Sequence, residues 1–358
     1  MFKKKLLLLP VLLAACSVSS FAQNNADSML AFFSSHKNTS SIICIKNDTL
    51  QVNWNTKEVL PMAATSNLLV AYEFAKQAAY KVIDTAEWVP LKDLARYYLP
   101  GNKTDQYGDW LGMMVAMKKT DEGRIKLQEI PIGMLQFGSP ALAEYLMDRL
   151  GFDNIKSNLQ SLGITEHSAI VAPVSSLVLF QNRVKTNPKK IKKAIEKMGE
   201  EEYCKSAFQM HLAVKNDSLF KNKIGPLNVT REFMRMWSDR LPQSNTLSYG
   251  QFLQMVMKEK MFEKKIYQHL RNVLEWPMKF PTVSNLFNRF SMTGSATPFV
   301  FSQAQYAVTK NNDSIIVVYT CVDLQEKDYS ALARWHQQFE LNMFTKPEFM
   351  AKAAAALK

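Results

Sequence analysis

Cysteine and glycine are scarce in this sequence. Only 4 cysteines occur among 358 residues. If Cys16 is lost or modified at the N-terminus, then Cys44, Cys204 and Cys321 remain, an odd number that cannot all pair within one chain. No disulfide framework is therefore expected. Cys44 and Cys321 lie in strand-like runs, "SIICIKND" and "SIIVVYTCVD", and are interpreted as buried free thiols.

Loops and clusters that hold phosphates or metal ions are also missing. The 12 glycines are scattered singly, and neither G-x-G-x-x-G nor G-K-[ST] occurs, so a nucleotide-binding loop is excluded. The 5 histidines show neither H-x-x-x-H nor a Cys/His cluster with metal-ligand spacing. No cofactor and no metal site are therefore expected.

The N-terminus, "MFKKKLLLLPVLLAACSVSSFAQNN", holds three lysines before an apolar run too short to span a bilayer. This pattern predicts a bacterial export signal. Two cleavage sites remain open: "LAAC" resembles a lipobox, which would remove residues 1–15 and lipidate Cys16, whereas cleavage after Ala22 would remove residues 1–22. The mature protein is expected outside the cytoplasm, as a periplasmic protein or an outer-membrane lipoprotein that contacts the membrane only through that anchor.

The charge balance is basic, and the composition is that of a folded protein. The formal charge of +12 falls to +9 when Lys3, Lys4 and Lys5 leave with the signal. In an envelope compartment this excess favours anionic lipid or cell-wall polymer as a partner, and nucleic acid is not expected. A hydrophobic content of 47% suffices for a large core, which excludes a disordered chain.

Strand-like segments lie near both ends of the chain, with helical spacing between them. After a polar leader, residues 41–55 predict two short strands around an Asn-Asp turn. A long helix is expected at 64–81, and helices continue to about residue 274. Residues 296–323 predict two further strands, and 329–344 a closing helix.

This order predicts an α/β (α+β) protein in which the N- and C-terminal strands share one sheet. The mature domain is expected over 28–358. Its α/β part would comprise 28–83 and 286–358, and an all-helical part, 84–285, would be inserted between them.

Four segments in order, "LPMAATSNLLVAYEFAKQ", "WVPLKDLARYYLPG", "MLQFGSPALAEYLMDRLG" and "FSMTGSATPFVFSQAQYAV", resemble the penicillin-recognising serine hydrolases. This family contains class A β-lactamases and D-alanyl-D-alanine peptidases, and the resemblance covers nearly all of the mature chain. It implies a β-lactamase/transpeptidase-like fold: an antiparallel sheet flanked by helices, with an inserted all-helical subdomain.

The nucleophile and base of that family are replaced in this chain. The family places S-x-x-K at the start of its first long helix, so that serine and lysine lie one turn apart on one face. Here the frame reads Ala64-Thr65-Ser66-Asn67. Alanine has no oxygen to attack a carbonyl, and an asparagine amide is no base near neutral pH. The degenerate catalytic positions are therefore Ala64 and Asn67.

The other two motifs are also altered. The S-x-N motif falls on Gly138, Ser139 and Pro140, and the lysine of K-T-G has become Met292, although Thr293 and Gly294 follow it. The E-x-x-L-N motif that deacylates class A enzymes is absent. The predicted cleft is therefore less positive than the family requires for an anionic substrate.

Two parts of the family's site need no side chains, because the oxyanion hole consists of backbone N–H groups. The resemblance places these groups at Ala64 and Ser295. The predicted ligand-binding set is Ala64, Ser139, Thr293, Gly294 and Ser295.

The first interpretation is a catalytically inactive, exported binding protein whose partner is a peptide-like or cell-wall-derived ligand or an envelope protein. The second is an active serine hydrolase with an altered nucleophile, Ser66 or Ser139. The third is a cleft packed shut by its own side chains.

Overall fold

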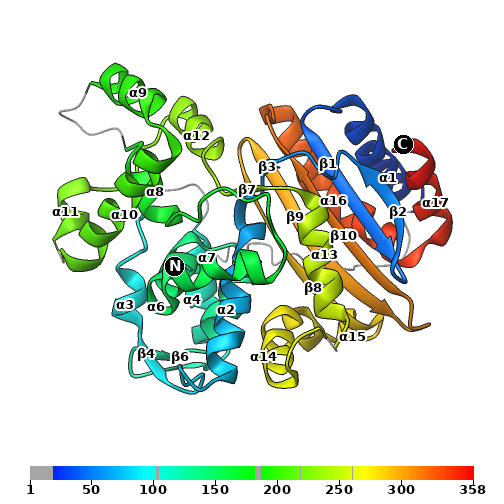
Figure 1. The fold of residues 1–358 in the computed structure, drawn as a ribbon, viewed down its shortest axis with the longest axis horizontal. Coiled ribbons are helices and arrows are strands. Elements are labelled where there is room, and N and C mark those ends of the chain that lie inside the picture. Colours follow the sequence, from blue (N-terminus) through cyan, green and yellow to red (C-terminus); the bar gives the residue numbers. More distant parts are fainter. Residues whose placement is uncertain (1–18, 102–104, 182–186, 218, 260) are drawn as a thin grey trace, which may run out of the picture.

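The computed structural model describes residues 19–358 except 102–104, 182–186, 218 and 260 (Figure 1). Cys16 and most of the predicted signal segment therefore lie outside the described residues. Within them, no helix is both long and apolar enough to cross a membrane.

The main sheet has five antiparallel strands in the order β2-β1-β10-β9-β8. These are β1 (Ser40–Lys46), β2 (Thr49–Trp54), β8 (Phe287–Thr297), β9 (Val300–Thr309) and β10 (Ser314–Cys321). The central pairing joins β1 to β10, which confirms that strands from the two ends of the chain share one sheet. Strand β8 forms one edge.

The turn between β1 and β2 explains why the sequence predicts this hairpin. Lys46 pairs with Thr49, so only Asn47 and Asp48 form the loop. Both have left-handed backbones, with φ of 49° and 63°. Such a two-residue turn requires positive φ at both positions, which Asn and Asp tolerate better than most residues. The predicted hairpin is confirmed.

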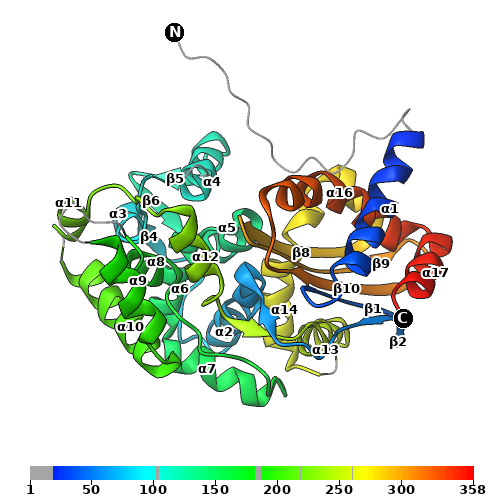
Figure 2. The same cartoon turned by 90° about the horizontal axis from the view of Figure 1, so that it is seen from above.

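Helices from the two ends of the chain cover one face of the sheet (Figure 2). They are α1 (Ser19–Ser35), α16 (Glu326–Thr345) and α17 (Pro347–Ala356). The rings of Phe33 and Phe339 lie 5.8 Å apart, and Phe339 packs edge-on against Tyr319 of β10 at 5.9 Å.

The polar leader expected before Ser41 is mostly the helix α1, so that interpretation was wrong. Ala26, Met29, Leu30 and Phe33 recur at helical spacing and are all buried. Polar residues between them hid this pattern. Helix α17 was also missed, because "PEFMAKAAAALK" offers few large apolar residues to show a period.

The opposite face of the sheet is contacted by α13 (Thr246–Met257) and α14 (Lys264–Leu274), and α2 (Asn67–Ala79) packs against α14 (Figure 2). Gly250 lets α13 approach β1 closely, because a Cβ there would lie 3.0 Å from Ile43 Cγ2. Helix α13 therefore packs on the sheet. The division at residue 285, which assigned this helix to the inserted part, does not match the packing.

The inserted part is mainly helical but not entirely so. It holds α3 (Leu91–Ala95), α4 (Gln106–Ala116), α5 (Glu129–Phe137), α6 (Pro140–Leu150), α7 (Phe152–Ser161), α8 (Pro173–Val178), α9 (Pro188–Lys197), α10 (Glu200–Asn216), α11 (Phe220–Ile224) and α12 (Arg231–Ser238). It also holds a small sheet of β4 (Trp88–Pro90), β5 (Thr120–Asp121) and β6 (Arg124–Lys126). Strands of two or three residues are too short to show a period of two, so the all-helical prediction missed them.

Remaining short elements join these layers. Strands β3 (Leu60–Pro61) and β7 (Gln243–Ser244) pair where the chain enters and leaves the inserted part. The turn η2 (Trp276–Lys279) and helix α15 (Pro281–Ser284) lead into β8.

A buried charge network ties α6, α8 and α10 together. The Glu144 carboxylate accepts hydrogen bonds from the N–H groups of Val174 (2.8 Å) and Ser175 (2.9 Å) and from His211 Nδ1 (2.9 Å). The other ring nitrogen of His211 lies 3.2 Å from Asp148. Burial alone would lower the pKa of His211, but the hydrogen bonds to Asp148 and Glu144 outweigh it and raise the pKa to about 9. His211 is therefore a cation between two carboxylates at neutral pH.

Candidate active site

A strained turn starts the helix that carries the degenerate S-x-x-K frame. Ala63 has φ of 45°, a left-handed conformation that is unusual for alanine. It opens the 3₁₀ turn η1 (Ala63–Ser66), which runs directly into α2. The turn is fixed to β9, because Ser302 Oγ donates to the carbonyl of Met62 at 2.9 Å and also bonds the Thr65 hydroxyl. Ala64 is thereby held against the edge of the sheet.

The N–H group of Ala64 already has an acceptor. It donates a 3.0 Å hydrogen bond to the side-chain hydroxyl of Ser295 on β8. The sequence predicted that the backbone N–H groups of these two residues would form an oxyanion hole. The structure brings the two residues together, but the Ser295 side chain occupies the place where an oxygen of a ligand would accept the Ala64 N–H.

The loop between α5 and α6 packs directly on the same part of β8. Gly138 has φ of 60°, and a Cβ built on it would lie 3.2 Å from Ser295 Cβ and 3.4 Å from the Gly294 carbonyl oxygen. The two walls of the predicted cleft therefore touch at this point. Pro140 begins α6, a position at which its missing N–H costs no helical hydrogen bond.

Neither fallback nucleophile is placed for chemistry. Ser66 is 7% exposed, and its hydroxyl donates to the Ala63 carbonyl at 2.8 Å. Ser139 is 0% exposed, and its hydroxyl has no hydrogen-bond partner among the described residues. Asn67, in the place of the lysine, is 4% exposed, and its side-chain amide makes no hydrogen bond to a described residue. No base lies within hydrogen-bonding reach of either serine in the described part of the chain.

The degenerate K-T-G motif lies on the edge strand β8. Thr293 and Ser295 pair with Ala304 and Ser302, and β8 packs against the turn η1, where Ser295 meets Ala64. The Thr293 hydroxyl is buried without a partner among the described residues. Met292 alternates to the other face, and its carbonyl accepts from Trp276 Nε1 at 3.1 Å. No cation therefore replaces the family's lysine at position 292.

Close packing against β9 leaves no room for a side chain at Gly294. A Cβ at Gly294 would lie 2.0 Å from Gln303 Oε1 and 2.6 Å from the Ser302 carbonyl oxygen. Packing alone therefore explains this residue without any role in ligand binding.

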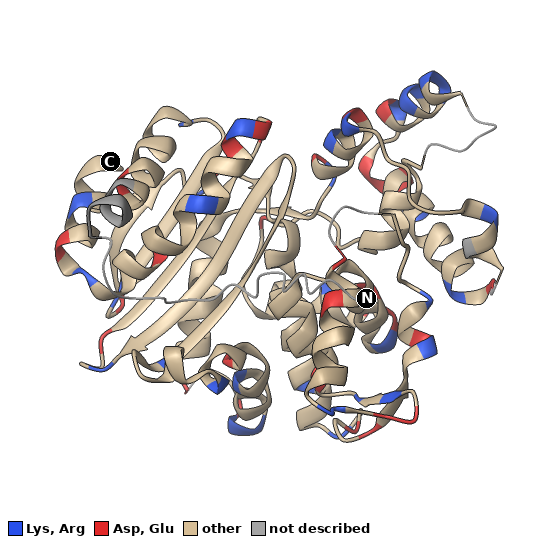
Figure 3. Cartoon of the chain, turned by 180° about the vertical axis from the view of Figure 1, so that it is seen from behind, with Lys and Arg blue, Asp and Glu red and all other residues tan. Residues whose placement is uncertain are grey.

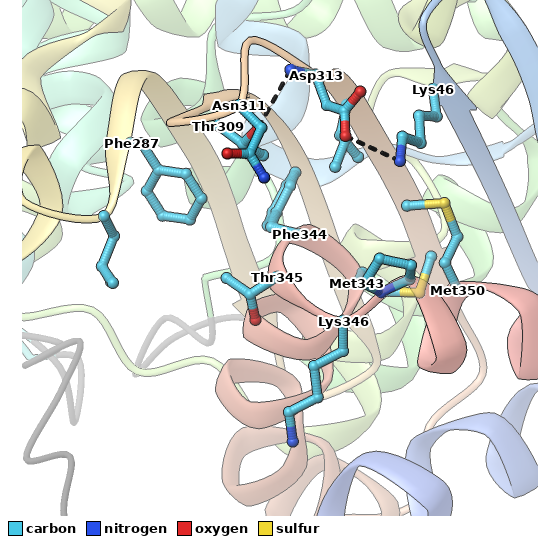
Figure 4. Close-up of a pocket in the computed structure, with 13 residues that line it drawn as sticks. Lys46, Phe287, Thr309, Asn311, Asp313, Met343, Phe344, Thr345, Lys346 and Met350 are labelled. Atoms are coloured by element: carbon cyan, nitrogen blue, oxygen red, sulfur yellow. Dashed lines mark hydrogen bonds and ion pairs between the residues drawn. The ribbon is translucent and has the colours of Figure 1, made fainter.

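Two cavities in the described part of the chain lie away from these residues. One, of about 180 Å³, lies between the β9–β10 turn and the junction of α16 with α17, where Phe287 and Phe344 line it beside a 3.0 Å ion pair of Lys46 with Asp313 (Figure 4). The other, of about 380 Å³, lies along α14. The described residues also contain no cluster of three or more His, Cys, Asp or Glu side chains that could hold a metal ion.

Sequence reasoning missed three residues that shape the site. Ala63, Thr65 and Ser302 set the turn before α2, yet an alanine with positive φ has no sequence signature. The bond between Thr65 and Ser302 joins positions far apart in the chain. Only the tertiary structure could have shown it.

The fold and the site geometry define a class, the serine β-lactamase and penicillin-binding-protein fold. No protein-family model matches the sequence. A comparison with curated protein sequences also finds no match. The likeness therefore rests on structure.

Among solved structures, a β-lactamase from Sphaerobacter thermophilus superposes with a TM-score of 0.53 at 11% identity, over 93% of this chain and 97% of that one. A class A β-lactamase from Bacteroides cellulosilyticus gives 0.52 at 12% identity, over 94% and 96%. A β-lactamase from Chitinophaga pinensis gives 0.51 at 10%, over 93% and 98%. At these identities the likeness shows the fold alone, and that fold confirms the predicted resemblance.

Proposed function

We propose that this chain is a catalytically inactive protein of the β-lactamase fold that acts in the cell envelope by binding a ligand or partner, without turning over a substrate. The observation that carries this proposal is the hydrogen bond from the Ala64 N–H to the Ser295 hydroxyl. A carbonyl oxygen needs that N–H free in order to be polarised.

The chemistry of the surrounding side chains supports the same proposal. Ala64 offers no nucleophilic oxygen, and Asn67 offers no base. Met292 gives no positive charge for a substrate carboxylate, and an unpaired carboxylate is costly to bury. Ser66 and Ser139 are buried away from any base among the described residues, so an altered nucleophile is not favoured.

A ligand at the degenerate site around Ala64 and Ser295 would have to pair with the unpaired edge of β8, as an extended peptide pairs with the edge of a sheet. It would displace Gly138 from Ser295 and would be an uncharged or capped peptide-like or cell-wall-derived segment. The export signal predicted before residue 23 supports a place in the envelope, as a periplasmic protein or as a lipoprotein anchored at Cys16.

The catalytic half of the proposal is tested on a purified chain beginning at Gln23. Benzylpenicillin and a fluorophosphonate are added, and the intact mass is measured beside an active class A β-lactamase. No mass increase is expected. An adduct that Ser66→Ala or Ser139→Ala abolishes would overturn the proposal in favour of an altered serine hydrolase.

The binding half is tested by titrating amidated and free-acid cell-wall peptides while the backbone amides of Ala64 and Ser295 are followed by NMR. Shifts with the amidated peptide are expected. Tighter binding of the free acid would contradict the charge argument. No shift with either peptide would mean that the site stays closed, which would leave only partner binding at the outer surface.

A further inference from the structure

A second candidate site lies along α14 and η2, outside the degenerate motifs. The cavity there measures about 380 Å³, within the size range of ligand pockets. It is lined by Glu259, Lys264, Tyr267, Gln268, Arg271, Asn272, Glu275, Met278 and Lys279. Figure 3 shows Lys and Arg gathered on α14 beside the sheet.

The acidic residue on the floor of this cavity is fully engaged by its neighbours. Glu275 accepts two hydrogen bonds from Arg271, at 3.1 and 3.0 Å, and one from Arg289 Nε at 2.6 Å. The buried hydroxyl of Tyr306 donates to it at 3.1 Å. Two guanidinium groups thus meet one carboxylate, so this group of residues keeps one positive charge in excess.

Several cationic groups around the cavity have donor atoms without a described partner. Arg289 Nη2 is buried and has no hydrogen-bond partner among the described residues. Lys264 and Lys279 also line the cavity, and no described carboxylate lies within 4.0 Å of either ammonium group. Burial lowers the pKa of Lys279, and this effect outweighs the attraction of Glu129, which raises it.

The charges of the cavity and its floor sum to a positive value. The cavity and its floor hold four cations and two carboxylates, which leaves two positive charges unmatched. The cations are Lys264, Arg271, Lys279 and Arg289, and the carboxylates are Glu259 and Glu275. A singly charged carboxylate would neutralise only half of this excess, whereas a phosphate monoester near neutral pH carries nearly two negative charges. Lysine ammonium groups donate charge-assisted hydrogen bonds to such oxygens.

We propose that this cavity binds a phosphate group, as free phosphate or as the terminal phosphate of a lipid headgroup, between Lys264, Arg271 and Lys279. The site is separate from the Ala64 and Ser295 region, and it does not depend on the function proposed above. Its floor connects to β8 through Arg289 and Glu275.

Calorimetric titration at constant ionic strength tests this site on the chain beginning at Gln23. Inorganic phosphate and glycerol 3-phosphate are the soluble ligands. Vesicles of phosphatidylcholine with and without phosphatidic acid form the lipid arm. The variant Lys264→Gln/Lys279→Gln removes two cavity cations. The matched control, Lys258→Gln/Lys265→Gln, removes two nearby cations that do not line the cavity.

The cavity variant is expected to bind about tenfold more weakly than the control variant, because two charge-assisted contacts are lost. In the native chain the backbone amide of Asn272 should shift with phosphate while that of Ala64 stays unchanged. Binding to phosphatidic acid vesicles alone, lost in the cavity variant, would assign the phosphate to a lipid. Equal binding by both variants, or no binding in either arm, would overturn the proposal, and neither result bears on the catalytic test.

Discussion

The backbone N–H of Ala64 and the side-chain hydroxyl of Ser295 are hydrogen-bonded at 3.0 Å. Ala64 stands where the fold's nucleophile is expected, and Ser295 follows the remnant of K-T-G. A residue of this chain therefore uses a donor that an enzyme of this fold would keep for its substrate.

Replacing Ser295 by alanine should free the Ala64 N–H without creating activity. The loss of one hydrogen bond is expected to lower the free energy of unfolding by about 1 kcal/mol. Urea denaturation and a nitrocefin assay check the two effects. Thr293→Val is the matched control, because the Thr293 hydroxyl is buried without a partner in the described structure and its removal should cost nothing. Nitrocefin turnover by Ser295→Ala would contradict this prediction.

Restoring the serine alone should not restore chemistry. Ala64→Ser supplies an oxygen, but Asn67 cannot take its proton, and residues of a catalytic unit act together. No acyl adduct with benzylpenicillin is expected by intact-protein mass spectrometry. A robust adduct from Ala64→Ser alone would show that Asn67 and Met292 are not disabling.

Adding a methyl group at Gly138 should reveal whether the walls of the site touch. Gly138→Ala forces alanine into a left-handed backbone, which costs roughly 1–2 kcal/mol, and also crowds Ser295 at 3.2 Å. Gly123→Ala is the control, since Gly123 has φ of 72° and no atom within 4 Å of the added Cβ. Urea denaturation should show a larger loss at Gly138. Equal losses would mean that the walls stand apart.

The His211 network should make stability fall in alkali. The pKa of His211 is raised from 6.5 in the unfolded chain to about 9. The contribution of His211 to the free energy of unfolding is therefore complete below pH 6.5 and is lost as the pH rises through about 9. Urea denaturation of the native chain between pH 6 and 10 measures this loss.

Replacing His211 isolates its share of that effect. His211→Ala leaves Glu144 without its cation, and breaking such a buried pair costs about 3–5 kcal/mol at pH 7. This variant should also lose much of the alkaline dependence, whereas His269→Ala should keep it. An unchanged pH profile in His211→Ala would contradict the assignment.

The three described cysteines should differ in reactivity. Cys44 and Cys321 are buried in β1 and β10, and burial raises the pKa of Cys44 to about 12. Cys204 on α10 is partly exposed. Ellman's reagent should label Cys204 in the native chain and the other two only in denaturant. The rapid phase should vanish in Cys204→Ala, and labelling of all three at one rate would show that the sheet does not protect its thiols.

The sequence predicted the fold well where local chemistry decides it. The Asn47-Asp48 turn and the apolar runs of β9 and β10 each carry a local signal, and their order gave the sheet. The motif remnants placed Ala64 and Ser295 near each other. The hydrogen bond between them could not be predicted, because it depends on the rotamer of one side chain. The floor of the cavity along α14 was also not predicted, because Glu275, Arg289 and Tyr306 come from three separate elements.

The pairing of β1 with β10 also determines when this protein can fold. Ser40 to Lys46 lie beside Cys321 to Ile315, so the ribosome makes β10 long after its partner β1. A lone β1–β2 hairpin is marginal in water, and such distant contacts slow the search for the native state. The sheet therefore forms only after β10 has been synthesised, and a chain cut short before β10 cannot form it.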